Sequence, residues 1–142
     1  MSGTKTSGPA ARRAVRSWLV MLSGCTAVLA AAGAIGLATG VVPLDQAGVT
    51  RLPWHSTAFG AVALLLVVAA PMTVLAVMTQ GDHPAWGRVA VAAGALLVGW
   101  IAAEIAVIQE LSWLQVIFAV IGVVVLWVGL RHIGPPPGHI VR

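Results

Sequence analysis

The sequence predicts an all-α integral membrane protein, a bundle of four transmembrane helices. Hydrophobic residues make up 59% of the 142 residues and charged residues only 8%, and the mean hydropathy is +0.98. This composition is too apolar for a soluble globular domain. Four apolar stretches reach the length of roughly 20 residues that crosses a hydrocarbon core of about 30 Å. They cover residues 19–40, 57–79, 88–109 and 113–130 approximately.

The charges argue against several classes of partner. The net charge of +4 rests on only eight lysine and arginine residues. These few basic residues indicate membrane topology and contacts with anionic lipid headgroups, rather than a surface that binds nucleic acid. The single cysteine, Cys25, has no disulfide partner and no companion metal ligands at a useful spacing. We therefore expect the lipid bilayer as the main partner, and no nucleic acid, metal or cofactor.

The N-terminal segment, residues 1–16, is small, polar and basic. It has no apolar face that would offset the entropy lost on ordering it. We therefore predict a flexible basic cytoplasmic tail, followed by a four-helix transmembrane domain over residues 17–131. Arg12, Arg13 and Arg16 would flank the first span on its cytoplasmic side.

Residues 22–25, Leu-Ser-Gly-Cys, match a bacterial lipobox, in which the cysteine is lipidated after cleavage. The apolar stretch between Arg16 and Leu22 is too short for a signal-peptide core of about 7 to 15 residues. Apolar residues also continue well past Cys25. We therefore expect an uncleaved transmembrane helix here.

Two rows of small residues with a spacing of four lie in the first and third spans. The rows are Ala32, Gly36 and Gly40, and Ala95, Gly99 and Ala103. Such rows allow two helix backbones to approach closely in lipid. We predict that they join the helices of the bundle, with packing between subunits as the alternative.

The second span follows a long loop over residues 41–56 and contains a proline. Ser56 or Thr57 is expected to cap its first turn. Pro71 predicts a kink near the middle of the membrane, because its ring clashes with the carbonyl of Val67.

The third span contains Glu104, the acidic residue that the sequence places within the predicted spans. A carboxyl group inside a bilayer is costly unless it is neutral, paired or exposed to water, so Glu104 is a candidate functional residue. Trp100 lies one turn earlier, and the two side chains would form a partly apolar site for a cation. In the alternative, Trp100 fills the core or faces lipid, and Glu104 reaches toward the membrane interface.

The fourth span begins at a well-marked position. Ser112 with Gln115 fits a capping box. Arg131 ends the span, and residues 132–142, with three successive prolines, predict an extended Pro-rich cytoplasmic tail.

Basic residues also predict the orientation of the bundle. Seven of the eight flank the spans on one side: Lys5, Arg12, Arg13, Arg16, Arg88, Arg131 and Arg142. Arg51 is the eighth and lies on the other side. Because positively charged flanks stay in the cytoplasm, we expect both termini there, and a location in the bacterial cytoplasmic (inner) membrane as a multi-pass protein.

Residues 99–101 (Gly-Trp-Ile), Glu104 and residues 112–115 (Ser-Trp-Leu-Gln) resemble a group of uncharacterised small four-span membrane proteins from high-GC, actinobacterial-type bacteria. The resemblance implies the fold and assigns no role to any residue. Small multidrug-resistance transporters are also four-span proteins with one essential membrane glutamate. This chain differs from them, because its acid lies in the third span instead of the first and it has no tyrosine.

Two functions agree with these patterns. The first is a structural or accessory, partner-binding membrane subunit, as a homo-oligomer or in a larger complex. The alternative is a proton-coupled or cation transporter that uses Glu104, as an oligomer. We expect no enzymatic activity and no catalytic residues, because the spans contain no histidine for haem, no metal constellation and no glycine-rich nucleotide motif.

Overall fold

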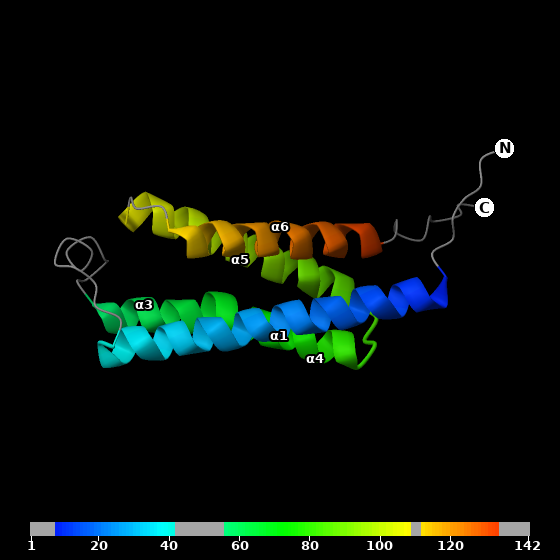
Figure 1. Cartoon of the computed structure of the whole chain (residues 1–142), viewed down its shortest axis with the longest axis horizontal. Helices are drawn as coiled ribbons and strands as arrows, with labels where there is room; N and C mark the ends of the chain where they lie inside the picture. Colours follow the sequence, from blue (N-terminus) through cyan, green and yellow to red (C-terminus); the bar gives the residue numbers. More distant parts are fainter. Residues whose placement is uncertain (1–7, 42–55, 109–111, 134–142) are drawn as a thin grey trace, which may run out of the picture.

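Four helical rods make up the computed structural model, which describes residues 8–41, 56–108 and 112–133 (Figure 1). These ranges contain no strand, and their elements are α1 (Pro9–Thr39), α3 (Thr57–Leu64), the π-helical turn η2 (Leu65–Ala69), α4 (Ala70–Gln80), α5 (Trp86–Ile108) and α6 (Trp113–His132). The elements α3, η2 and α4 follow one another without a break and form one rod. Each of the four rods is long and apolar enough to cross a membrane. The predicted fold class is confirmed.

Helix α1 begins at Pro9, so the prediction of a flexible tail is wrong for residues 9–16. Proline suits a first helical turn because its missing N–H would have no partner there. The alanines and arginines that dominate residues 10–16 are good helix formers. With 31 residues, α1 is about 46 Å long and exceeds a hydrocarbon core of about 30 Å. The predicted Pro-rich tail, residues 132–142, starts one residue too early, because His132 still belongs to α6. Residues 1–7 and 134–142 lie outside the described residues.

The second rod is irregular next to Pro71, and the irregularity is a π-helical turn. The Ala70 N–H reaches back to the Leu65 carbonyl, five residues earlier, where a regular α-helix would reach back four. The turn directly precedes Pro71, whose missing N–H and bulky ring disturb the preceding helical pattern. The Thr73 hydroxyl donates to the Ala69 carbonyl at 2.8 Å. A π-helical turn is one of the recognised causes of a bend in a helix.

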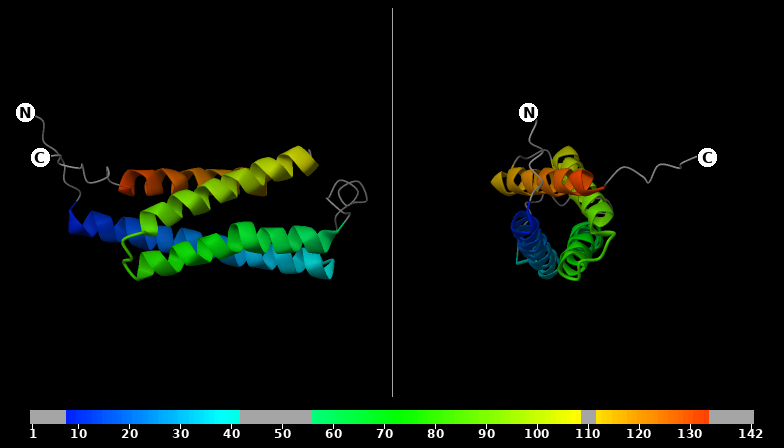
Figure 2. Two further views of the ribbon diagram at one scale, coloured as in Figure 1. Left: turned by 180° about the vertical axis from the view of Figure 1, so that it is seen from behind. Right: turned by 90° about the vertical axis from the view of Figure 1, so that its right-hand side faces the viewer.

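The four rods form two pairs. Helix α1 packs along α3, η2 and α4, and helix α5 packs closely along α6 (Figures 1 and 2). The pairs meet where α5 crosses α4 and η2, whereas α1 and α6 scarcely touch. From that crossing, the α5–α6 pair diverges from the α1–α3 pair toward the end of the molecule where α3 begins (Figure 1).

Glycines bring α5 and α6 into backbone contact. A Cβ atom added at Gly94 would lie 2.6 Å from the Leu126 nitrogen and 2.7 Å from the Gly122 oxygen. One added at Gly129 would lie 2.7 Å from the Val91 nitrogen. Since burial of apolar surface gives little drive to helix association within lipid, close backbone packing of this kind is what holds such helices together.

The predicted small-residue row of α5 lies on another face of the helix. Ala95, Gly99 and Ala103 are exposed, and a Cβ added at Gly99 would meet no atom within 4 Å. The prediction that this row joins the helices of the bundle is therefore wrong. Gly94 precedes Ala95 by one position, and one position turns a helix by roughly 100°, so the contact face and the predicted row point in different directions.

The prediction that the row in α1 joins the helices of the bundle is also wrong. Ala32 and Gly40 are exposed and Gly36 is half-buried. The small residues that α1 buries are Ser23, Thr26, Ala27, Ala30 and Ala34. Gly40 instead ends the helix, because its φ of 71° is left-handed, as glycine readily allows, and its N–H donates to the Leu37 carbonyl.

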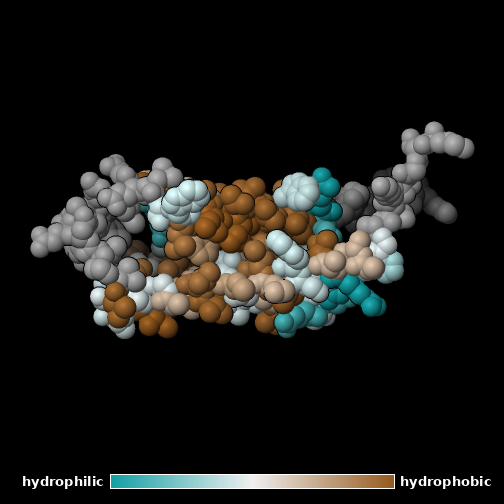
Figure 3. Space-filling view, in the orientation of Figure 1, coloured by the Kyte–Doolittle hydropathy of each residue, from teal (hydrophilic) through white to brown (hydrophobic). Residues whose placement is uncertain are grey.

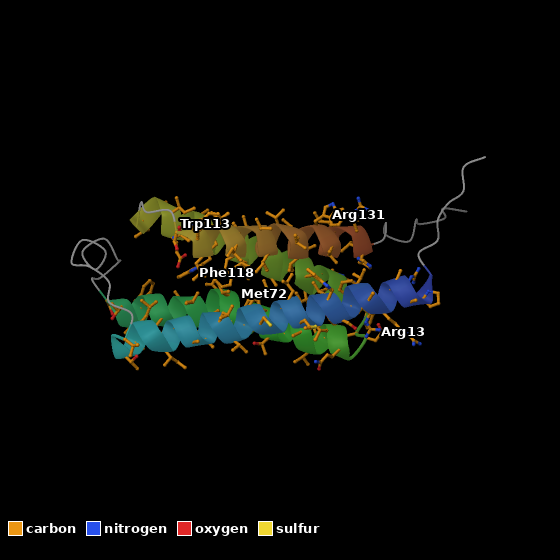
Figure 4. All side chains as sticks on the ribbon, in the orientation of Figure 1. Arg13, Met72, Trp113, Phe118 and Arg131 are labelled. Atoms are coloured by element: carbon orange, nitrogen blue, oxygen red, sulfur yellow. The ribbon has the colours of Figure 1, made fainter. Side chains whose placement is uncertain are left out.

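The centre of the bundle and its outer surface are both apolar. The largest fully buried hydrophobic side chains are Met72 and Leu75 of α4, Leu97 of α5 and Val125 of α6, and Met72 lies near the middle of the bundle in Figure 4. In Figure 3 hydrophobic residues cover the middle of the visible face, and hydrophilic residues gather at the right-hand end. An apolar belt with a polar end is what a protein needs to cross a bilayer.

Both predicted helix caps are present. The Ser56 Oγ accepts a hydrogen bond from the Phe59 N–H at 3.3 Å, at the start of α3. At the start of α6, the Ser112 Oγ accepts from the Leu114 N–H at 3.3 Å and the Gln115 Oε1 accepts from the Ser112 N–H at 3.0 Å. The second arrangement is the predicted capping box.

Candidate functional site

Glu104 and Trp100 lie together on α5 and face the same cavity. Their spacing of four residues places them on one side of the helix, one turn apart. Both side chains are partly buried, and both line a cavity of about 240 Å³ between the two helix pairs. The structure thus brings together the two residues that the sequence marks as a candidate site.

All four rods contribute to this cavity, which lies where the two pairs diverge. Its polar lining comes from Glu104, Trp100, Ser112 and Gln115. Its apolar wall consists of Leu29, Ala30, Gly33, Leu64, Val68, Leu97, Leu114 and Phe118. Phe118 lies on the side of α6 that faces the α1–α3 pair (Figure 4). The carboxyl group of Glu104 is therefore set in a largely apolar chamber.

Gln115 is a residue of this site that the sequence did not reveal. Its side chain is largely buried, and its Oε1 is fixed by the Ser112 N–H in the capping box. The amide of Gln115 also approaches the Glu104 carboxyl. The capping-box spacing predicted the bond to Ser112, but the approach to Glu104 depends on how α6 lies against α5.

The Trp100 indole N–H also approaches the Glu104 carboxyl. The approach falls short of hydrogen-bond geometry, so the buried Trp100 Nε1 has no hydrogen-bond partner among the described residues. A buried donor without a partner costs about 1–3 kcal/mol. The site therefore contains an N–H donor that a small shift of Glu104, or an acceptor within the cavity, would satisfy.

The chemistry of this site suits a cation with an apolar part. Within the described residues, no lysine, arginine or histidine lines the cavity, and no group of three or more His, Cys, Asp or Glu side chains is placed to hold a metal ion. One carboxyl group is too little to replace the six or more oxygen ligands of a hard cation such as Ca²⁺. A carboxyl group in a cavity lined by an indole ring and apolar side chains is better matched to an organic ammonium group.

Three tryptophans of the second helix pair, Trp86, Trp113 and Trp127, lie near the ends of α5 and α6. Trp113 is exposed at the start of α6, and the Arg131 guanidinium lies 4.0 Å from the centre of the Trp127 ring near the end of that helix. Figure 4 shows Trp113 and Arg131 toward opposite ends of α6. The Trp86 ring lies 4.6 Å from the ring of His132. These positions are typical of side chains at the membrane interface, which sets Trp100 apart.

Neither a protein-family model, nor a curated protein, nor a solved structure matches this chain.

Proposed function

We propose that this protein binds a small organic cation at Glu104 and carries it across the membrane. One observation supports the proposal above all others: the acidic side chain of α5 lines a cavity to which both helix pairs contribute. A carboxyl group with a purely structural role would be expensive there, since an apolar residue of similar size could fill the space. A bound cation would offset that cost.

The size and lining of the cavity indicate the class of ligand. Its volume of about 240 Å³ lies below the roughly 300–1,000 Å³ of sites for drug-sized ligands. The indole ring of Trp100 lines the cavity, and Leu97 and Phe118 offer an apolar wall. A cation that reached the face of this ring would be attracted by about 0.5–2 kcal/mol. A quaternary or protonated amine with one short apolar or aromatic group meets these requirements.

Transport requires the two helix pairs to move against each other. Backbone contact at Gly94 holds α5 to α6, whereas α1 and α6 scarcely touch. Rocking of one pair on the other, about the contact of α5 with α4, would open the cavity alternately to each side. Because the Glu104 carboxyl can hold either a proton or a cation, we propose exchange of one for the other. The proposed activity includes no catalytic step.

We further propose the cytoplasmic membrane of a bacterium as the location, with both termini in the cytoplasm. Arg13 and Arg131 lie at the same end of the bundle (Figure 4), and basic flanks remain on the cytoplasmic side. Reporter fusions after Gly48 and at the C-terminus should give signals for outside and inside, respectively. The reverse pattern would contradict this orientation.

Binding and flux measurements test the main proposal. The purified protein should bind radiolabelled benzyltrimethylammonium in equilibrium dialysis, and vesicles that contain it should take up this cation in response to a proton gradient. Glu104→Gln preserves size and hydrogen bonding, so it should fold normally and lose both activities. Asp82→Asn is the matched control, because it removes an exposed carboxylate outside the cavity. Unchanged binding and uptake by folded Glu104→Gln would overturn the proposal.

A second candidate is an accessory subunit that packs against another membrane helix, in a homo-oligomer or a larger complex. It is supported by the exposed row of Ala95, Gly99 and Ala103, where α5 offers a smooth face with open space at Gly99. A partner helix could approach closely along such a row.

Leucine substitutions test this second candidate. Gly99→Leu should leave the protomer folded and abolish association, measured by cross-linking in native membranes. Gly24→Leu is the control, because it makes the same change at another open position, on α1. If both variants associated as strongly as the unsubstituted protein does, the row would be ruled out as an interface.

A further inference from the structure

A second cavity lies at the other end of the bundle, where the first turns of α1 pass the end of α4. It is a groove of about 440 Å³. Its lining residues are Arg13, Arg16, Ser17, Val20, Met21, Thr79 and Gln80. Arg13 marks this end of α1 in Figure 4. The groove shares no residue with the cavity at Glu104.

Arg16 builds one wall of the groove. Its Nη2 donates to the Thr79 carbonyl at 2.8 Å and to the Gln80 carbonyl at 3.4 Å, and its Nη1 lies 3.0 Å from Asp82 Oδ1. A cation at this place is favourable, because the last carbonyls of a helix have no partner within it and carry partial negative charge. The Arg16 side chain is thereby held in position, and Asp82 offsets its charge.

The polar end of the groove keeps unused charge and hydrogen-bonding groups. Within the described residues, Arg13 forms no ion pair. The ion pair found there joins Arg16 and Asp82. Arg16 Nε and Thr79 Oγ1 are buried and have no hydrogen-bond partner there, and Thr79 is 0% exposed. The polar end of the groove therefore has a net positive charge from Arg13 and Arg16, which favours an anionic ligand.

The lining changes from polar to apolar along α1. Arg13, Arg16 and Ser17 come first, and Val20 and Met21 follow toward the middle of the bundle. Eight positions separate Arg13 from Met21, which is about 12 Å along a helix. This order matches a phospholipid, whose charged phosphate lies at the interface and whose acyl chains extend into the membrane. A free phosphate ion would leave the apolar part of the groove without a partner.

We propose that this groove binds one anionic phospholipid, with the phosphate at Arg13 and Ser17 and an acyl chain along Val20 and Met21. Arginine beside a hydroxyl group is a suitable donor set for a phosphate oxygen. Because a zwitterionic lipid carries its own ammonium group, its net attraction to Arg13 is weaker. The site is independent of the cation proposed at Glu104.

Native mass spectrometry of the delipidated full chain, titrated with short-chain phosphatidylglycerol, tests the proposal. We expect one tightly retained lipid, and weaker retention of phosphatidylcholine with the same chains. Arg13→Gln should weaken phosphatidylglycerol binding about tenfold, the usual effect of losing one charged hydrogen-bond donor. Arg12→Gln is the matched control, since it removes the same charge from the adjacent residue, which does not line the groove.

Three results would overturn the proposal. They are equal weakening by Arg12→Gln and Arg13→Gln, equal retention of the two lipids, and displacement of phosphatidylglycerol by inorganic phosphate at matched concentration. The first would mean general attraction to a basic surface, and the third would mean a site for the free anion. Circular dichroism should show that both variants remain folded, as expected for two exposed side chains.

Discussion

Substitution of Gly94 by alanine tests the backbone contact on which the α5–α6 pair depends. The new Cβ would lie 2.6 Å from the Leu126 nitrogen, whereas ordinary contacts begin at 3.4 Å, so the helices must separate by about 0.8 Å. A gap of roughly 0.5–1 Å forfeits a quarter to a half of the dispersion energy of each contact along the interface. The neighbouring atoms belong to the backbone and cannot rotate away.

The expected magnitude follows from two opposing effects. Overpacking of a well-packed interior costs about 1–3 kcal/mol, and alanine is favoured over glycine within a helix by about 0.5–1 kcal/mol. We therefore expect Gly94→Ala to lower the free energy of unfolding by about 1–2 kcal/mol. Equilibrium unfolding in mixed micelles, followed by circular dichroism as the fraction of sodium dodecyl sulfate rises, would measure the change.

Gly99→Ala is the control for this experiment. It introduces the same methyl group on the same helix, but into open space. Only the helix-propensity effect remains, so the free energy of unfolding should rise by up to about 1 kcal/mol. If Gly94→Ala proved as stable as Gly99→Ala, the backbone contact between α5 and α6 would be refuted.

Three further predictions concern single side chains. Ser112→Ala removes an N-cap and should lower the free energy of unfolding by about 1 kcal/mol in the same titration; no loss would mean that the capping box does not form. Asp82→Asn breaks the exposed ion pair with Arg16 and should cost less than about 1 kcal/mol, with no difference left in about 1 M salt; a salt-independent loss would count against the pair. Trp100→Phe keeps an aromatic ring and removes an N–H that has no partner among the described residues, so the free energy of unfolding should not fall. Its cation affinity in dialysis should fall less than that of Trp100→Leu. Equal losses of affinity in the two variants would exclude a role for the ring.

The spans and helix caps could be predicted because they depend on local properties of the chain. The sequence predicts the second span over residues 57–79, and the helix runs over Thr57–Gln80, since the loop residues on either side limit the length of the apolar run. Ser112 and Gln115 are three residues apart and make their bonds within the first turn of α6. The sequence does not predict the start of α1 at Pro9, because the composition of residues 9–16 suits both a basic tail and an exposed helix.

The contact faces of the helices could not be predicted in the same way. In a soluble protein, polar residues mark the outer face of a helix, but lipid is as apolar as the interior, and both sides of a membrane helix look alike in sequence. From the sequence alone, the row of Ala95, Gly99 and Ala103 is therefore as good a contact face as the one that contains Gly94. The rotation of α5 against α6 decides between them, through the backbone atoms that approach Gly94.

The sequence by itself determined that the chain forms four helices long and apolar enough to cross a membrane. It also determined that Glu104 is unusual, because a carboxyl group within an apolar run is costly wherever the run packs. Only the tertiary structure decided what surrounds that group. The capping residue Gln115 comes from a different helix, and Arg16 reaches the carbonyl of Thr79 across 63 positions of the chain. Both sites join residues from separate helices, and their geometry is set by how the two pairs cross and diverge.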